Sequence, residues 1–133
     1  MGNRALVQFI KPESKSEFTN HVEPADFSPV IYLHWAGQLE EAIKQTKELM
    51  KSRRADLSYI PARFVGVCHE LIEGSLSLGM WNATGNLTHE DSHGDMGCIL
   101  INVGTWEIEQ TGHYIDCKLR LPETFKVTYS EAQ

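Results

Sequence analysis

The stretch VIYLHW, residues 30–35, constrains the fold more than any other part of this chain. An unbroken apolar run of this length is typical of a strand with both faces buried. Gly37 follows, and from Gln38 to about Arg53 apolar residues recur at i, i+3, i+4 and i+7, which predicts a helix with one buried face. We therefore expect a central strand that turns at Gly37 into a covering helix. The apolar residues of that helix are Leu39, Ala42, Ile43, Thr46, Leu49 and Met50.

Six further stretches have the composition or the apolar–polar alternation of strands. They are residues 4–10, 75–82, 98–103, 106–110, 114–121 and 124–129. A hairpin is predicted where Gly104-Thr105 joins two of them, because two-residue links that begin with glycine suit hairpins. The residues expected to point inward from the last two stretches are Ile115, Cys117, Leu119, Leu121, Phe125, Val127 and Tyr129.

A second helix is predicted from Pro61, a favourable first-turn residue, to about Glu73. Strands and helices are segregated along the chain rather than alternating. This order predicts an α+β fold: a mostly antiparallel sheet of five to seven strands with two helices packed on one face. A chain of 133 residues suits a single domain spanning 1–133. We interpret the proline-punctuated segment 11–29 as a long surface loop, and 112–133 as a C-terminal strand extension.

Composition excludes several classes of protein. The net charge of −6 argues against a general nucleic-acid binder, and it is compatible with docking on a basic surface. The three cysteines are far apart and form no C-x-x-C pair, so neither a disulfide framework nor a zinc knuckle is predicted. No apolar stretch approaches the roughly 18 residues of a membrane helix, and the first residues do not form a secretory signal. We expect a cytoplasmic protein that does not bind membranes.

The segment HEDSHGD, residues 89–95, contains the residue types that bind metal ions. Its spacing matches no defined metal site, so we prefer to interpret it as a polar turn and predict no cofactor. The residues that would serve as metal ligands in the alternative interpretation are His89, His93 and Asp95.

Adjacent residues of a strand point to opposite faces, so His34 and Trp35 cannot serve the same surface. The interpretation we favour places Trp35 in the core and gives His34 a local hydrogen bond. In the alternative, one of the two belongs to a patch that binds a ligand or a partner, where aromatic residues concentrate.

No sequence motif favours an enzyme. Cys68 and His69 are neighbours, but Cys68 lies on the apolar stripe of the second predicted helix and is expected to be a core residue. The chain has no G-x-S-x-G elbow, P-loop or dinucleotide fingerprint. Arg4 and Arg63 are expected to form a salt bridge with Asp91 or Asp95, or to hold an anion.

Several segments, taken in order, resemble a family of small uncharacterised proteins encoded by phages and prophages. The matching residues are Gly2-Asn3-Arg4-Ala5, Tyr32-Leu33-His34-Trp35 with Gly37, Ala62-Arg63, Leu76-Ser77-Leu78-Gly79, Asp91 with Gly94-Asp95 and Gly97, and Trp106 with Ile108. The shorter relatives lack the 11–29 loop and the tail after about 112, and they often have Asn-Gly-Gly where this chain has Ala36-Gly37-Gln38. The resemblance supplies no catalytic residues. It implies a phage-type accessory protein working in the bacterial host cytoplasm.

These observations lead to one preferred function and two alternatives. The preferred function is non-enzymatic: binding and inhibition of a host protein or ribonucleoprotein complex, as a counter-defence protein of the anti-CRISPR type. The first alternative is a sponge that sequesters a small signalling nucleotide, and the second is a metal-dependent enzyme using the 89–95 loop. Self-association is left open. The candidate binding residues are Arg4, His34, Trp35, Arg63, Trp81, Asp91 and Asp95.

Overall fold

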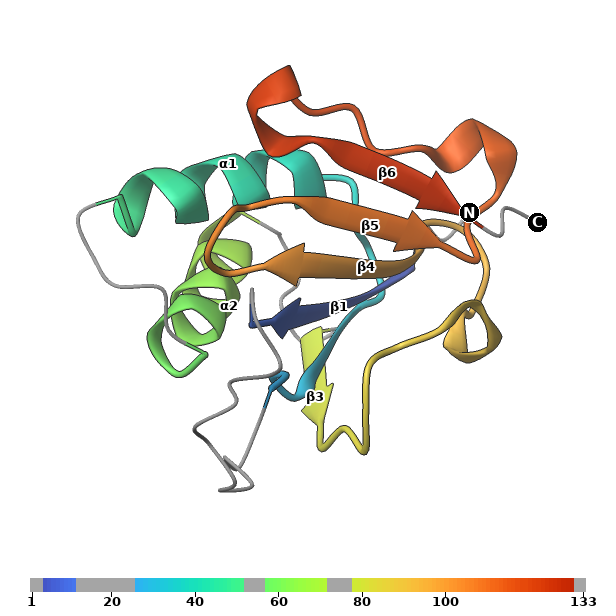
Figure 1. The fold of residues 1–133 in the computed structure, drawn as a ribbon, viewed down its shortest axis with the longest axis horizontal. Coiled ribbons are helices and arrows are strands. Elements are labelled where there is room, and N and C mark those ends of the chain that lie inside the picture. Colours follow the sequence, from blue (N-terminus) through green and yellow to red (C-terminus); the bar gives the residue numbers. More distant parts are fainter. Residues whose placement is uncertain (1–3, 12–25, 52–56, 72–77, 131–133) are drawn as a thin grey trace, which may run out of the picture.

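A computed structural model describes residues 4–11, 26–51, 57–71 and 78–130 of the chain. Its strands form one six-stranded sheet in the order β3-β2-β1-β4-β5-β6 (Figure 1). β1–β4 and β5–β6 are parallel pairs, and the other three neighbouring pairs are antiparallel. The predicted α+β fold with a mostly antiparallel sheet is therefore confirmed. The strands span Ala5–Ile10 (β1), Val30–Leu33 (β2), Leu78–Trp81 (β3), Gly97–Asn102 (β4), Ile108–Thr111 (β5) and Val127–Ser130 (β6).

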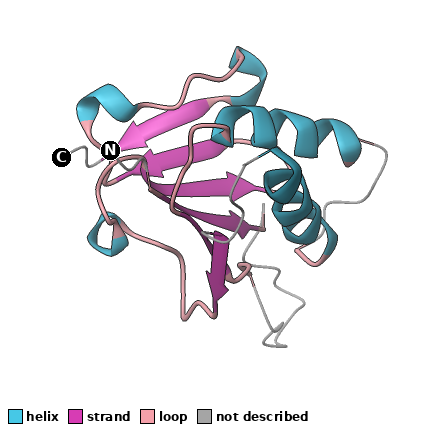
Figure 2. Ribbon diagram, turned by 180° about the vertical axis from the view of Figure 1, so that it is seen from behind, coloured by secondary structure: helices cyan, strands magenta, loops and turns pink. Residues whose placement is uncertain are grey.

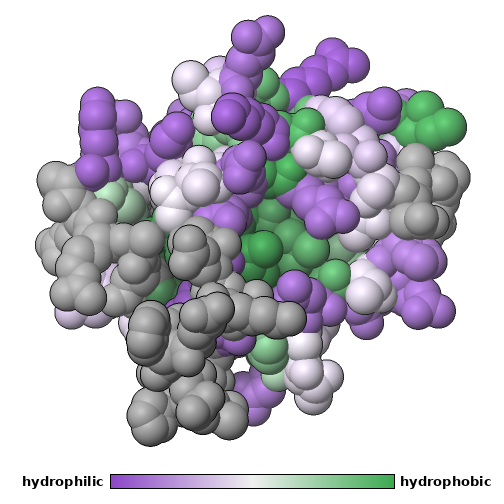
Figure 3. Space-filling model, viewed as in Figure 1, coloured by the Kyte–Doolittle hydropathy of each residue, from purple (hydrophilic) through white to green (hydrophobic). Residues whose placement is uncertain are grey.

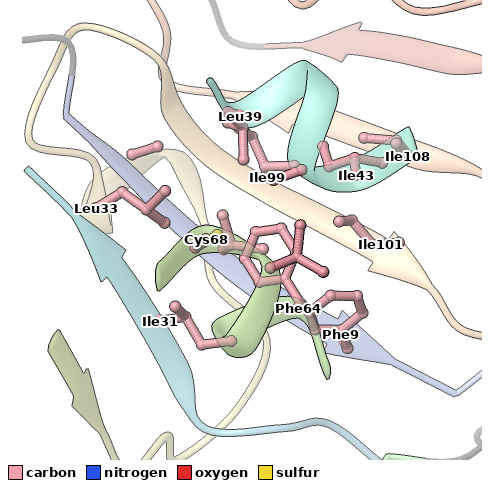
Figure 4. Packing of buried hydrophobic residues seen from close by; sticks show 14 of the residues in the cluster. Phe9, Ile31, Leu33, Leu39, Ile43, Phe64, Cys68, Ile99, Ile101 and Ile108 are labelled. Atoms are coloured by element: carbon pink, nitrogen blue, oxygen red, sulfur yellow. The ribbon is translucent and has the colours of Figure 1, made fainter. Parts of the chain in front are cut away.

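The two helices, α1 (Leu39–Leu49) and α2 (Tyr59–Leu71), pack on one face of the sheet, as predicted (Figure 2). We call this side the helix face. Its core is built from alternate residues of the central strands and from the apolar stripes of both helices. The Phe9 and Phe64 rings meet edge to face, with centroids 5.4 Å apart, where β1 lies under α2 (Figure 4).

Helix α1 is shorter than the predicted 38–53, and residues 52–53 lie outside the described residues. Leu39, Ala42, Ile43 and Thr46 are buried as predicted, but Leu49 is 60% exposed. The prediction for Leu49 is wrong because the helix ends there, and Met50 takes the inward position instead. Helix α2 begins two residues before the predicted Pro61 and is described up to Leu71; residues 72–73 lie outside the described residues.

The opposite side of the sheet, called here the second face, has a smaller apolar cluster of its own. Leu6, Cys98 and Leu100 from the strands pack there with Leu87, which lies in the loop after β3. Figure 3 shows apolar side chains gathered near the middle of the face seen in Figure 1, with polar side chains around them. Among the described residues, Leu87 brings the loop after β3 over part of the second face, whereas both helices pack on the other face.

The hairpin between β4 and β5 is longer than the predicted two-residue link. The last paired residues are Ile101 and Ile108, and the Asn102 backbone N–H donates to the Glu107 carbonyl at 2.9 Å. The Asn102 side-chain oxygen accepts hydrogen bonds from two backbone N–H groups of the turn, and Trp106 adopts a positive φ of 62°. Trp106 therefore belongs to the turn and not to the strand. The turn is longer than predicted because the Asn102 side chain bonds to its backbone.

The prediction of a strand over 114–121 is wrong. Residues Ile115–Cys117 form a short 3-10 turn (η3), and Ile115 is 69% exposed. The backbone of this segment is hydrogen-bonded to the side chain of Gln110 instead of to the backbone of a neighbouring strand. The Gln110 amide donates to the Cys117 carbonyl at 2.9 Å, and its oxygen accepts from the Leu119 N–H at 2.8 Å. Only Leu119 of the predicted inward residues in this segment is fully buried.

The last strand is confirmed with later bounds than predicted. A 3-10 turn (η4, Glu123–Phe125) buries Phe125, and Lys126 with φ 49° leads into β6, which pairs with β5 at the edge of the sheet. Val127 is half-buried, but Tyr129 is 39% exposed, so its predicted inward position is wrong. An edge strand has a neighbour on one side only, which leaves Tyr129 open to solvent.

Most of the predicted 11–29 loop lies outside the described residues. Its two ends are held together beside β1. The Lys11 N–H donates to the Asp26 carbonyl at 3.0 Å, and the Ser28 N–H donates to the Phe9 carbonyl at 2.8 Å.

Candidate functional site: an aromatic cluster at the β2–β3 edge

Five ring-bearing side chains meet at the edge of the sheet formed by β2 and β3. We call Tyr32, His34, Trp35, Trp81 and His93 the aromatic cluster. Tyr32 lies at its centre: its ring stacks on Trp81 with centroids 5.9 Å apart and contacts His93 edge to face at 5.7 Å. His34, Trp35 and Trp81 are candidate binding residues from the sequence, whereas His93 was predicted only as a metal ligand in the alternative interpretation and Tyr32 was not a candidate.

Strand register explains why Tyr32 and Trp81 stack. Tyr32 on β2 pairs with Gly79 on β3, and Trp81 lies two residues further along the same face. A β-carbon at Gly79 would lie 3.9 Å from the Tyr32 side chain, so the tyrosine ring lies beside the glycine and reaches its diagonal neighbour. Diagonal cross-strand pairs of aromatic residues stabilise sheets in this way.

The preferred prediction for His34 and Trp35 is half right. β2 ends at Leu33, and His34 Nδ1 is hydrogen-bonded to the Tyr32 hydroxyl at 2.9 Å, which confirms a local hydrogen bond. Trp35 is not a core residue, because 45% of its surface is exposed. Ala36 takes the buried position on the way into α1, and the Trp35 ring instead meets His34 edge to face at 5.0 Å.

An ion pair fixes the loop that carries His93. The Arg4 Nε and backbone N–H both donate to Asp95 Oδ2 at 3.1 Å, and Arg4 Nη2 donates to the His93 carbonyl at 2.6 Å. Burial alone would raise the pKa of Asp95, but the hydrogen bonds and charge of Arg4 together lower it below its ordinary value. The expected salt bridge is thus formed by Arg4 with Asp95. Arg4 is committed to holding this loop against the start of β1.

The 89–95 segment is a polar turn, as the preferred interpretation has it. Residues His89–Asp91 form a 3-10 turn (η2) closed by a reciprocal cap, in which Asp91 accepts the Thr88 N–H at 2.8 Å and Thr88 accepts the Glu90 N–H. Within the described ranges, no three His, Cys, Asp or Glu side chains come close enough to hold a metal ion. His89, His93 and Asp95 therefore do not form a ligand set.

Gln8 positions the loop that borders the cluster, and the sequence analysis missed it. Its side chain is fully buried on the second face. The amide donates to the Gly85 carbonyl at 3.0 Å and to the Ser28 carbonyl at 3.1 Å, and its oxygen accepts from the Leu87 N–H at 2.8 Å. One side chain of the central strand thus satisfies backbone groups of two different loops. An isolated glutamine within an apolar strand was the only sequence signal for this role.

A small hollow lies next to the cluster, between the end of β3 and η2. Its volume is about 160 Å³, and Trp81, Asp91, Val30 and residues 82–87 line it. Two larger hollows lie elsewhere. One of about 580 Å³ is lined by Ile10, Leu100 and polar residues of β5 and β6, and one of about 330 Å³ lies between α1 and Phe125. Of these three hollows between described residues, the small one contains the candidate residues Trp81 and Asp91.

Among the described cations, Arg63 and the lysines of α1 lie away from the cluster. Arg63 is exposed on α2, which packs on the helix face. Arg4 directly precedes β1, whose first residue lies at the end of the strand far from α2 (Figures 1 and 2). The lysines of α1 are engaged locally. Lys44 pairs with Glu41 at 3.4 Å, and Lys47 lies 4.6 Å from the centre of the Phe125 ring.

Cys68 is a core residue, as predicted. It is fully buried on α2, and burial raises the pKa of its thiol to about 12. A thiol with such a pKa is not ionised near neutral pH and is a poor nucleophile.

Comparison with protein-family models, curated proteins and solved structures finds no match for this chain. None of the helices in the described part of the chain has the length and apolar character needed to cross a membrane.

Proposed function

We propose that this chain is a non-enzymatic binding protein that docks on a host factor through the aromatic cluster and inhibits it. In this proposal it is a small phage-type accessory protein of the bacterial cytoplasm, and its partner is a defence complex with a basic, nucleic-acid-binding surface. The observation that carries the proposal is the exposure of Trp35 and Trp81, each 45%, in one cluster: Trp81 stacks on Tyr32, and Trp35 contacts His34. Partly exposed aromatic residues grouped on a fixed scaffold are the residue types that dominate the energy of protein interfaces.

The surroundings of the cluster support a basic partner. Glu90 and Asp91 are exposed in η2, next to the loop that carries His93, and the whole chain has a net charge of −6. Complementary charge accelerates association and selects the partner more than it adds affinity. We therefore expect the association rate with a basic complex to fall as salt concentration rises.

The two alternatives have less support. A nucleotide sponge needs cations near an aromatic side chain, but Arg4 is held by Asp95, and Arg63 lies on the helix face. The hollow beside Trp81, at about 160 Å³, is also smaller than the roughly 300 Å³ at which small-molecule sites begin. The metal-dependent enzyme lacks a converging ligand set in the described residues.

The test is a binding assay against a panel of purified bacterial defence complexes, including CRISPR effectors. Trp35→Ala and Trp81→Ala are each expected to weaken binding by roughly 30-fold, which corresponds to the 2 kcal/mol of an interface hot spot. Leu49→Ala is the matched control, because it removes an exposed apolar side chain from α1, away from the cluster. If no complex binds at low or physiological salt, the proposed function is wrong.

Native mass spectrometry of protein purified from a bacterial host separates the alternatives. A mass equal to that of the chain, or to a multiple of it, agrees with the proposed function. Bound mass equal to a nucleotide would favour the sponge, and bound mass equal to a metal ion would favour the enzyme.

A further inference from the structure

The small hollow beside the aromatic cluster joins two kinds of wall. Trp81 and Asp91 both line it, and the chain from Asn82 to Leu87 completes the lining with Val30. One side of the Trp81 indole stacks on Tyr32, yet nearly half of the residue's surface stays exposed. An aromatic residue and an acidic residue therefore border the same small space. We call this space the Trp81–Asp91 pocket.

The carboxylate of Asp91 is fixed in place while retaining capacity to bind. Its Oδ2 accepts the Thr88 N–H at 2.8 Å and lies 3.3 Å from the Thr88 hydroxyl. Its other oxygen, Oδ1, accepts no hydrogen bond from a described residue. Asp91 thus retains an acceptor oxygen that no described residue occupies, on a side chain that lines the pocket.

The loop that lines the pocket is also held in position before any ligand arrives. Gln8 bonds to the Gly85 carbonyl and the Leu87 N–H, so this loop is tied to the central strand β1. Leu87 itself is buried in the apolar cluster of the second face. A site whose walls are already ordered loses less conformational entropy on binding.

We propose that the Trp81–Asp91 pocket binds a guanidinium group, the side chain of an arginine on the partner protein. An indole attracts a cation through its ring electrons, and a carboxylate adds charge-assisted hydrogen bonds. Guanidinium fits better than ammonium because it is planar, stacks on aromatic rings and is less strongly hydrated. The volume of about 160 Å³ suits one side chain and not a nucleotide. The proposal rests on the proposed function, because the arginine belongs to the partner.

Direct binding of a small probe tests the pocket without any partner. The probe is N-acetyl-arginine amide, and N-acetyl-citrulline amide is its uncharged counterpart of nearly the same shape. Binding is followed by NMR through the indole N–H signals of the three tryptophans, Trp35, Trp81 and Trp106. We expect a saturable shift of the Trp81 signal with the arginine probe and at least about tenfold weaker binding of the citrulline probe, as loss of a charged hydrogen-bond partner implies.

A pair of variants one residue apart completes the test. Asp91→Asn removes the charge but keeps an oxygen that can accept the Thr88 hydrogen bonds, so the turn is preserved. Glu90→Gln removes the same charge from a residue that does not line the pocket. The Asp91→Asn variant should bind the arginine probe about tenfold more weakly, and the Glu90→Gln variant should bind it like the unmodified chain.

Equal binding of the two probes, or an unchanged affinity in Asp91→Asn, would overturn the proposal. The outcome is separable from that of the proposed function. If a defence complex binds Asp91→Asn as tightly as it binds the unmodified chain, the pocket is wrong and the proposed function stands. If the arginine probe binds but every defence complex fails to, the pocket stands and the proposed function is wrong.

Discussion

Replacing Gln8 by methionine should destabilise the protein far more than its small change in volume implies. Methionine has nearly the same length as glutamine, so the cavity contribution is small. The change leaves the Leu87 N–H and the Gly85 and Ser28 carbonyls without their present partner. At about 1 kcal/mol for each hydrogen bond, the free energy of unfolding should fall by about 3 kcal/mol. This is a large part of the roughly 5–15 kcal/mol that stabilises a domain.

Urea unfolding followed by circular dichroism measures this loss. With a slope of about 2 kcal/mol per molar, the midpoint should fall by about 1.5 M. Gln45→Met is the matched control, because Gln45 is exposed on α1 and bonds only to Glu41 at 3.1 Å. Its midpoint should correspond to a change within about 0.5 kcal/mol. Amide hydrogen exchange at Leu87 should also become faster in Gln8→Met. If the two variants unfold at the same urea concentration, the role assigned to Gln8 is wrong.

Three further predictions concern other described positions. Burial, with a smaller effect of the Lys118 charge, lowers the pKa of His113. The free energy of unfolding should therefore be greatest above about pH 6.5 and fall below it, because the unfolded chain takes up the proton first. His113→Phe should flatten this pH dependence, as measured by urea unfolding. Asp95→Asn should cost about 1 kcal/mol at pH 7 and nothing in acid, where the carboxylate is already protonated, as measured by urea titrations at both pH values. Gly97→Ala should lower the melting temperature strongly, because its β-carbon would lie 2.3 Å from a backbone oxygen at φ +69°, whereas Gly66→Ala on α2 should be neutral or stabilising.

The layers of the fold could be predicted from the sequence because apolar periodicity reports burial directly. Both helices and the strands β1, β2, β3 and β4 lie within a few residues of their predicted positions. Alternation was misleading at Tyr129, which is exposed at the edge of the sheet, and at 114–121, where it matched a strand that does not form. The partner of that backbone is the Gln110 side chain, which lies in a neighbouring strand. Such a tertiary contact leaves no periodic signal in the segment that it holds.

The candidate site could be predicted in its residue types but not in its assembly. Arg4 was singled out because it opens the first predicted strand, and its pairing with Asp95 was one of the alternatives expected. The exposure of Trp35 could not be predicted, since the preference of tryptophan for burial is only statistical. It depends on where β2 ends, and the ends of elements are the least certain part of a sequence-based prediction.

The two edges of the sheet differ in a way that favours the β3 side for docking. At the β6 edge, Lys126 precedes the strand and the Lys118 ammonium lies 4.9 Å from the centre of the Tyr129 ring. Lysines beside an edge strand oppose the approach of another chain, and most strongly that of a basic one. β3, with the sequence LGMW, carries no charge, and its Met80 and Trp81 are 52% and 45% exposed. Within the described part of the chain, β3 itself thus presents no cation to a basic partner, and Asp91 lines the hollow next to Trp81.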